Sequence, residues 1–209
     1  MESYGAHLFT PSVRAEQDRV GSGQKYEMVY RSRNLGDLDP PTRSFIESCT
    51  SFYMASISSN GWPYLQHRGG PAGFLKILGP DLLGFADYRG NEQFISKGNL
   101  RDNDRVALFL MDYPRRARLK LIGHATMIDT AEDADLARRL AQEGAPRPER
   151  LATIQVVALD WNCPKYITPR LSEAEIEAIF APRIQALGKR IEDLEARLDR
   201  ADPNWRDSE

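Results

Sequence analysis

The chain has 209 residues, of which 41% are hydrophobic and 28% are charged, and 28 basic against 30 acidic side chains give a formal net charge of −2. This is the composition of a globular domain that buries a core without disulfides or a metal, and the balanced charge argues against nucleic acid as a partner. There is no run of 18 apolar residues and no basic start followed by an apolar stretch, so we expect neither a membrane span nor a secretory signal. Two cysteines are too few for a disulfide framework, so we expect a cytoplasmic protein.

Two short helices are predicted in the first 50 residues. The first begins after Thr10, which suits the N-cap position ahead of a proline, and runs to Val20 before a glycine-rich break. The second begins after Asp39 in the same way. We expect residues 1–38 to form a helical arm and residues 39–171 to form the main domain. The expected buried side of the second helix consists of Phe45, Ile46 and Cys49.

The main domain reads as a series of closely spaced strands with few helices between them, which favours an antiparallel barrel or sandwich. The stretch 105–111 is continuously apolar, so we expect a strand buried on both faces. Gly123 interrupts a long strand and predicts a β-bulge. The expected strands are 52–57, 62–67, 74–78, 82–86, 105–111, 118–128 and 153–161, with short helices at 91–97 and 131–143.

The C-terminal segment has the pattern of a helix instead of strands. Ser172 and Glu175 form a capping box, which predicts a helix start. Apolar side chains then follow at spacings of 4, 4, 3, 4, 3 and 4 from Ile176 to Leu198, so residues 172–209 are expected to form an amphipathic helix with a heptad seam. Such a seam must be buried, and it packs either on the chain's own barrel or against another subunit.

Two segments of the main domain carry glycines and cations together. A glycine-rich stretch lies between Arg68 and Lys76, where backbone can approach a flat or anionic ligand closely and both side chains can donate to phosphate. Further on, Arg89 and Gly90 form a turn at the end of a strand, and a helix is expected to start at Asn91. A helix N-terminus beside an arginine suits a phosphate group.

A third cationic segment lies on the long strand, where alternation places Arg118 and Lys120 on one face. The three segments together fit a phosphorylated, partly flat cofactor held at a barrel rim. The sequence has no motif for nucleophilic catalysis, nucleotide binding or metal binding: there is no nucleophile elbow, no Walker A or Rossmann loop and no metal-binding histidine pattern. We expect Cys49 and Cys163 to be buried and inert.

The order of these motifs resembles the pyridoxamine 5′-phosphate oxidase-like, FMN-binding split-barrel family over about residues 40–168. The resemblance implies a six-stranded antiparallel split barrel that forms a homodimer, with two FMN sites between the subunits, and flavin redox chemistry in most enzymes of the family. The motifs that carry it are Gly61-Trp62-Pro63 with Arg68, Gly73-Phe74-Leu75-Lys76, Gly90-Asn91, Asp104 to Phe109, Arg118 to Gly123, and Asp160 to Pro164.

The resemblance also implies roles for single residues. Arg68 and Lys76 match basic positions near the flavin phosphate and ribityl chain, while Arg118 falls where a polar residue contacts the isoalloxazine ring. Independently of the resemblance, either Arg118 or Lys120 is expected to stabilise negative charge that develops on the reduced ring. The phosphate loop corresponds to Arg89, Gly90 and Asn91, and a late aromatic contact corresponds to Trp161.

These observations predict an FMN-dependent oxidoreductase that transfers hydride between flavin N5 and a small-molecule substrate. Vitamin B6 oxidation is not expected, because the acidic C-terminal helix replaces the substrate-binding tail of the true oxidases. His67 is a candidate general acid or a core histidine. The alternatives are a flavin carrier or sensor without turnover, or a protein that binds a deazaflavin or haem, for which His67 and His124 are the strand-borne histidines.

Overall fold

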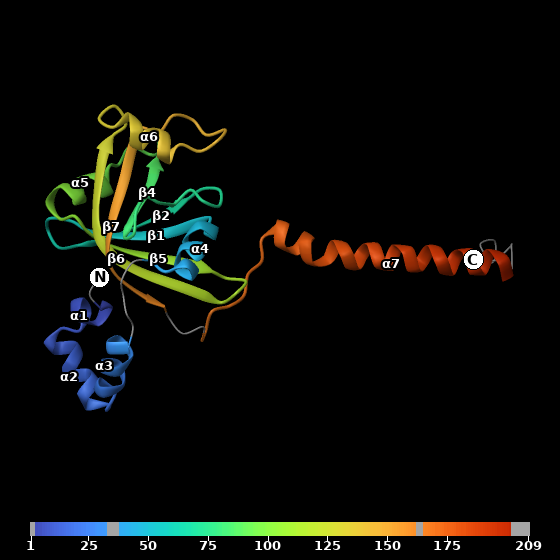
Figure 1. The fold of residues 1–209 in the computed structure, drawn as a ribbon, viewed down its shortest axis with the longest axis horizontal. Coiled ribbons are helices and arrows are strands. Elements are labelled where there is room, and N and C mark those ends of the chain that lie inside the picture. The colour runs from blue at the N-terminus through green and yellow to red at the C-terminus, as the bar shows by residue number, and fades with distance from the viewer. Residues whose placement is uncertain (1–2, 33–37, 162–164, 202–209) are drawn as a thin grey trace. The chain divides into compact units, whose positions relative to one another are not determined.

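The computed structural model describes residues 3–32, 38–161 and 165–201. These residues fall into two compact units, Met1–Ile167 and Thr168–Glu209. The first unit contains the described strands and all described helices except the last, which belongs to the second unit (Figure 1). Cys163 lies outside the described residues, so its expected burial is not addressed by the structure.

Seven antiparallel strands form one sheet in the first unit. They are β1 (Ser51–Ile57), β2 (Pro63–Gly69), β3 (Lys76–Ile77), β4 (Leu82–Asp87), β5 (Arg105–Asp112), β6 (Ala117–Asp129) and β7 (Arg150–Trp161). Their order across the sheet is β2-β1-β5-β6-β7-β4-β3. The predicted mainly β, antiparallel architecture is confirmed, but there are seven strands where the family resemblance implied six. The shortest is β3, which keeps two residues of the strand expected over 74–78 and pairs with β4 at one edge.

The sheet closes on itself through side chains between β2 and β4, which are not neighbours in the strand order. The Arg68 guanidinium of β2 forms an ion pair with the Asp87 carboxylate of β4. Beside it, the rings of Phe52 and Phe85 meet edge to face, with centroids 5.4 Å apart, and the Arg68 guanidinium lies over the Phe85 ring. Because side chains rather than a ladder of backbone hydrogen bonds make this junction, the barrel is split there.

Gly123 marks the bulge that the sequence predicted. The register between β6 and β7 shifts between Ile122 and Gly123. A Cβ atom on Gly123 would lie 2.3 Å from the Gln155 carbonyl oxygen of the neighbouring strand. The two backbones therefore approach more closely at the bulge than any side chain permits.

β5 differs from its prediction as a strand buried on both faces. Its side chains alternate, with Val106, Leu108 and Leu110 buried and Arg105 and Ala107 exposed. After Arg105, its outward face is built from small or apolar residues, which made the sequence look continuously hydrophobic. The strand is therefore buried on one face, as is usual in an antiparallel sheet with one face on the core.

Three helices pack around the sheet: α4 (Pro40–Ser48), α5 (Ile95–Asp102) and α6 (Ala134–Leu140). Asp39 caps α4 as predicted, its carboxylate accepting a hydrogen bond from the Thr42 N–H at 2.9 Å. The expected buried residues of α4 are also confirmed. The first part of the chain forms α1 (Tyr4–Leu8), α2 (Pro11–Arg19) and α3 (Gly23–Ser32), of which only α2, capped by Thr10, was predicted.

The second unit contains α7 (Glu173–Ala201), a single helix of 29 residues. The predicted capping box is present: the Ser172 N–H donates to Glu175 Oε2 at 2.8 Å, and the Glu175 N–H donates to Ser172 Oγ at 3.3 Å. No residue of α7 is buried within the part of the chain that the structure describes.

Candidate functional site

A cavity of about 220 Å³ opens between β2, the loop that follows β4, and the beginning of α5. Alternate residues of β2, namely Tyr64, Gln66 and Arg68, form one wall. The loop contributes the segment from Tyr88 to Phe94 with the exception of Arg89, and Arg150 enters from β7. Three cations, Arg68, Lys97 and Arg150, line the cavity against two carboxylates, Asp87 and Glu92. Its lining therefore carries a positive excess.

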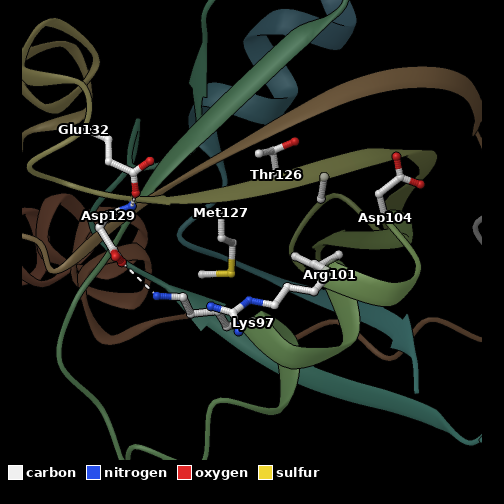
Figure 2. A pocket seen from close by; sticks show the side chains of 9 residues that line it. Lys97, Arg101, Asp104, Thr126, Met127, Asp129 and Glu132 are labelled. Atoms are coloured by element: carbon white, nitrogen blue, oxygen red, sulfur yellow. Dashed lines mark hydrogen bonds and ion pairs between the residues drawn. The ribbon is translucent and has the colours of Figure 1, made fainter. Parts of the chain in front are cut away.

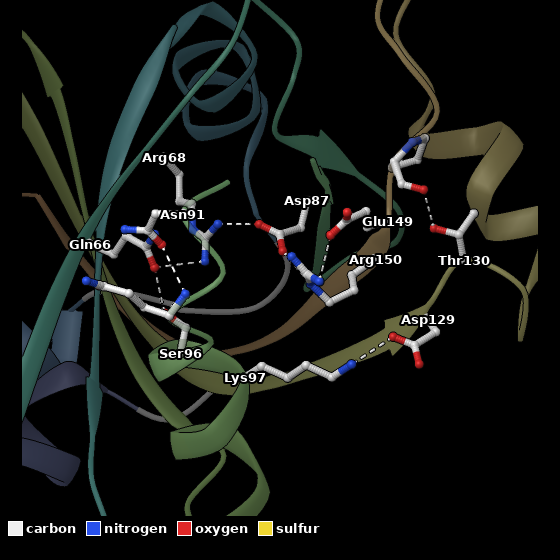
Figure 3. Close-up of polar contacts among 12 residues, drawn as sticks. Gln66, Arg68, Asp87, Asn91, Ser96, Lys97, Asp129, Thr130, Glu149 and Arg150 are labelled. Carbon is white, nitrogen blue, oxygen red and sulfur yellow. Dashed lines mark hydrogen bonds and ion pairs between the residues drawn. The ribbon is translucent and has the colours of Figure 1, made fainter. Parts of the chain in front are cut away.

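One buried carboxylate sits between two of these cations (Figure 3). Asp87 pairs with Arg68 through one oxygen and accepts a hydrogen bond from Arg150 Nε at 2.8 Å through the other. The side chains of Arg68, Asp87 and Arg150 are 15%, 6% and 12% exposed, so all three are shielded from water. Shielded charges interact strongly, so Asp87 holds both guanidinium groups at the cavity wall.

Arg150 has a further partner in Glu149, whose carboxylate lies 2.9 Å from Nη1. Burial disfavours the charged form of Arg150, but the hydrogen bond and the negative charge of Asp87, together with Glu149, outweigh it and raise the pKa of the guanidinium. Arg150 thus stays positively charged at the cavity wall under all ordinary conditions.

The beginning of α5 adds backbone donors to the cavity. The N-cap residue Phe94 has a left-handed backbone with φ of 54°, and its side chain supplies no capping acceptor. Phe94, Ile95, Ser96 and Lys97 all line the cavity. The first N–H groups of a helix without a side-chain cap are suited to bind an anion. The helix starts at Ile95, and the predicted start at Asn91 is wrong, because residues 91–94 form part of the loop.

Two polar groups at the cavity have no hydrogen-bond partner in the described chain. They are Nε of Arg68 and the hydroxyl of Tyr88, both fully buried. Burial also raises the pKa of Tyr88. Buried polar groups are nearly always satisfied in native proteins, so orphaned donors beside a cavity are consistent with a site for a polar ligand.

The predicted site residues divide into those that meet at this cavity and those that do not. Arg68, Gly90 and Asn91 line it together. Arg89 belongs to the same loop, but it is 75% exposed and pairs with Glu92 at 2.8 Å instead of lining the cavity. Lys76 lies half-buried on β3, opposite Gly84, and does not line the cavity either.

The predicted ring contacts form a second group, at the beginning of β6 and the end of β7. Lys120 pairs with Asp160 at 2.9 Å, and Arg118 has a buried Nε without a partner in the described chain. Trp161 donates from Nε1 to Thr42 Oγ1 at 3.3 Å and packs edge to face on Phe45. None of these predicted ring contacts lines the cavity of Arg68.

Sequence reasoning missed the roles of Asp87, Lys97 and Arg150. The last strand was expected to begin at residue 153, which left Arg150 in a polar loop, whereas β7 begins at Arg150 and pairs it with Asp87. Asp87 could have indicated this site, because it is the lone acidic residue at the end of the apolar strand β4. Such a residue needs a cationic partner if it is buried.

The histidines do not enter the cavity. His67 points to the other face of β2 from Gln66 and Arg68, where its ring meets Tyr53 edge to face. His124 Nδ1 lies 2.9 Å from Asp104 Oδ1, and this pair is half-exposed. Among the described residues, no cluster of histidine, cysteine and acidic side chains is suited to a metal ion.

A second cavity of about 270 Å³ adjoins the first and shares Lys97 and Met127 with it (Figure 2). Lys97 Nζ lies 2.8 Å from Asp129 Oδ1 across its mouth. The Lys97 hydrogen bond and charge lower the pKa of Asp129. Arg101 and Asp104 also line this second cavity. The Lys97 side chain therefore separates two polar hollows.

Two solved structures are similar to this chain. A HupZ variant from Group A Streptococcus is 14% identical with a TM-score of 0.50, over 60% of this chain and 99% of that chain. A protein related to general stress protein 26, of the pyridoxinephosphate oxidase family, from Clostridium acetobutylicum is 16% identical with a TM-score of 0.45, over 58% of this chain and 85% of that chain. No curated protein matches the sequence.

Two further findings bear on the class of protein. Within the described residues, no helix combines the length and apolar character needed to cross a membrane. The sequence of residues 38–161, more than half of the chain, matches the pyridoxamine 5′-phosphate oxidase family. This match covers β1 to β7 and the whole of the cavity described above. The chain therefore belongs to the pyridoxamine 5′-phosphate oxidase family.

Proposed function

We propose that the protein is an FMN-binding flavoprotein and that the cavity of Arg68 and Arg150 holds the flavin phosphate. The observation that carries the proposal is the buried pair of arginines sharing one carboxylate, Asp87, at a cavity that also receives the uncapped start of α5. A phosphate dianion would accept charge-assisted hydrogen bonds from these cations and from the first N–H groups of the helix.

The residues present fit the proposed group. Arg68, Lys97 and Arg150 would balance the phosphate charge, and the loop at Gly90 and Asn91 would let backbone approach it. A Cβ atom on Gly90 would meet no atom within 4 Å, so the loop leaves open space at this point. The orphaned Tyr88 hydroxyl offers a further donor close to the ligand.

Bound FMN would supply hydride transfer at its N5 atom to or from a small-molecule substrate. The chain's own contribution is binding and charge. Arg118 and Lys120 would stabilise negative charge that develops on the ring. Lys120 is held by Asp160 and lies over the Tyr4 ring, so its ammonium group has a fixed position.

We also propose a homodimer with the cofactor site between subunits. In one chain, Arg68 and the group of Arg118, Lys120 and Trp161 do not line a common cavity, so a partner subunit is needed to bring them to one ligand. A hollow of about 730 Å³ on the outer face of β1, β5, β6 and β7 supports this pairing. Apolar residues line most of it, including Ala55, Ala107, Ile122 and Val157.

The proposed location is the cytoplasm. Cys49, the one cysteine within the described residues, is free and buried, which agrees with a reducing compartment. The proposed substrate is a small molecule other than a vitamin B6 phosphate. The acidic helix α7 follows the barrel domain in the sequence, at the place where true pyridoxamine-phosphate oxidases carry substrate-binding residues.

The first experiment is the visible spectrum of the purified protein, with mass identification of any group released on denaturation. We expect a flavin spectrum and FMN, and a colourless protein that ignores added FMN in titration calorimetry would refute the proposal. Bleaching by NADH or NADPH followed by reoxidation in air would establish turnover. A flavin that stays oxidised would instead support a carrier or sensor.

The phosphate assignment has a sharper test in Lys97→Gln. We expect the apo-protein of this variant to lose about tenfold in affinity for FMN and to keep its affinity for riboflavin, which lacks the phosphate. Arg101→Gln is the matched control, because Arg101 lies one turn further along α5 and lines the neighbouring cavity instead. Equal losses for FMN and riboflavin, or equal effects of the two variants, would contradict the assignment.

A further inference from the structure

The apolar stripe of α7 is the largest group of exposed hydrophobic side chains on one described helix. Phe180, Ile184, Leu187, Ile191, Leu194 and Leu198 are all between 41% and 66% exposed. From Phe180 onward they follow the 4, 3, 4, 3, 4 spacing of heptad positions a and d, so they form one continuous seam along the helix. A seam of this kind is stable only when another surface covers it.

We propose that this seam is covered by α7 of a second copy of the chain, in a parallel, in-register, two-stranded coiled coil. The residue types at the core positions select this partner. Isoleucine occupies position a at Ile184 and Ile191, while leucine occupies position d at Leu187 and Leu194. β-branched residues at a combined with leucine at d favour two parallel strands over three or four.

The charged flanks select the same orientation. Arg183, Arg190 and Arg197 occupy position g, and Glu195 occupies position e. In a parallel pair, each g residue faces the e residue five positions later in the partner helix, so Arg190 meets the partner's Glu195. In an antiparallel pair, g residues face g residues, which would bring arginines together. Opposite charges thus meet only in the parallel form.

The two helix breakers of α7 do not interrupt its apolar core positions. Pro182 falls at the outward position f, and Gly188 falls at the flanking position e, so both core positions stay apolar from Phe180 to Ala201. This seam spans about 33 Å at 1.5 Å per residue, or about three heptads. A coil of this length is weak alone, so the inference rests in part on the proposed homodimer, which raises the effective concentration of one helix for the other.

Disulfide trapping in the full-length chain tests the inference. Leu194→Cys places a thiol at position d, where it faces its own copy in a parallel, in-register coil but faces a position-a residue of the partner in an antiparallel one. With oxidised glutathione, we expect most of this variant to become a covalent dimer. Lys189→Cys, at the outward position f, and the unmodified chain with its two native cysteines are the controls, and both should stay uncrosslinked.

Charge exchange tests the orientation. In the Leu194→Cys background, Arg190→Glu and Glu195→Arg should each reduce the trapped fraction severalfold, and the double exchange should restore it. Residues five apart are not neighbours on one helix, so rescue reports pairing between chains. The Arg190–Asp193 contact within the helix is lost in the double variant as well and cannot explain rescue.

The outcomes separate this inference from the proposed homodimer. A dimeric mass in solution, without trapping of Leu194→Cys above the Lys189→Cys level, would overturn the coiled coil and leave the homodimer standing. A monomeric mass would overturn both. Trapping without rescue by the charge exchange would overturn the parallel, in-register arrangement.

Discussion

Asp87 holds the two sides of the split barrel together, and its replacement by asparagine should show how much this contact contributes. Asp87→Asn keeps the shape of the side chain but removes the negative charge that Arg68 and Arg150 share. All three side chains are at most 15% exposed, so neither arginine gains enough water to compensate. Removing one partner from a buried charged group costs about 3–5 kcal/mol.

Urea denaturation followed by circular dichroism measures this loss. With an m-value of about 2 kcal/mol per molar, a loss of about 4 kcal/mol lowers the unfolding midpoint by about 2 M. Asp135→Asn is the matched control, because its pair with Arg138 is 74–82% exposed and should contribute less than about 1 kcal/mol. A midpoint for Asp87→Asn no lower than that of the control would refute the argument.

The same variant also tests the proposed phosphate site. Without the Asp87 carboxylate, Arg68 loses its ion-pair partner and Arg150 keeps only Glu149. Inorganic phosphate at constant ionic strength should therefore raise the unfolding midpoint of Asp87→Asn by more than it raises that of the natural chain. Equal increases in the two proteins would show that phosphate acts on them generally instead of at this cavity.

Three further predictions concern the barrel and the C-terminal helix. Gly123→Ala places a Cβ atom 2.3 Å from a backbone oxygen, so we expect a loss of about 2–4 kcal/mol in urea unfolding, and a loss below 1 kcal/mol would contradict the bulge geometry. Burial, with a smaller effect of Asp112, raises the pKa of Cys49 from 9.0 to about 12, so the folded state keeps a proton that the unfolded chain releases. The stabilising effect of this proton is present below pH 9 and is lost as the pH rises towards 12. Peptide mapping after alkylation at pH 8 should find Cys49 unmodified in the native protein, and rapid labelling would disprove its burial. Deletion of residues 171–209 should weaken self-association in analytical ultracentrifugation, and an unchanged dimer of unchanged stability would count against the seam.

Much of the fold was accessible from local chemistry. Thr10, Asp39 and Ser172 each satisfy backbone N–H groups at a helix start, and such caps depend on a few neighbouring residues. The bulge at Gly123 was likewise visible as a glycine inside a strand pattern. The strand expected over residues 74–78 is also present as β3, paired with β4, but it keeps only two residues.

The site was harder to predict, because its contacts join residues far apart in the sequence. Arg68 and Asp87 are 19 residues apart, and Asp87 and Arg150 are 63 apart. Glycines and arginines pointed to the cavity-lining loop at Gly90, but nothing local distinguishes the exposed Arg89 from the cavity-lining Arg150. Burial decides between them, and burial depends on the closed barrel.

The inward arginine of β2 has a consequence for handling this protein. β2 is an outer strand of the sheet, and such strands tend to recruit backbone from other molecules and aggregate. A charged side chain turned inwards, as Arg68 is, makes intermolecular strand addition costly, and Pro63 removes one donor from the same edge. Variants with a neutral residue at position 68 should therefore be expressed and stored at low concentration. They lose the charge that opposes aggregation through the edge of β2, as well as a proposed ligand contact.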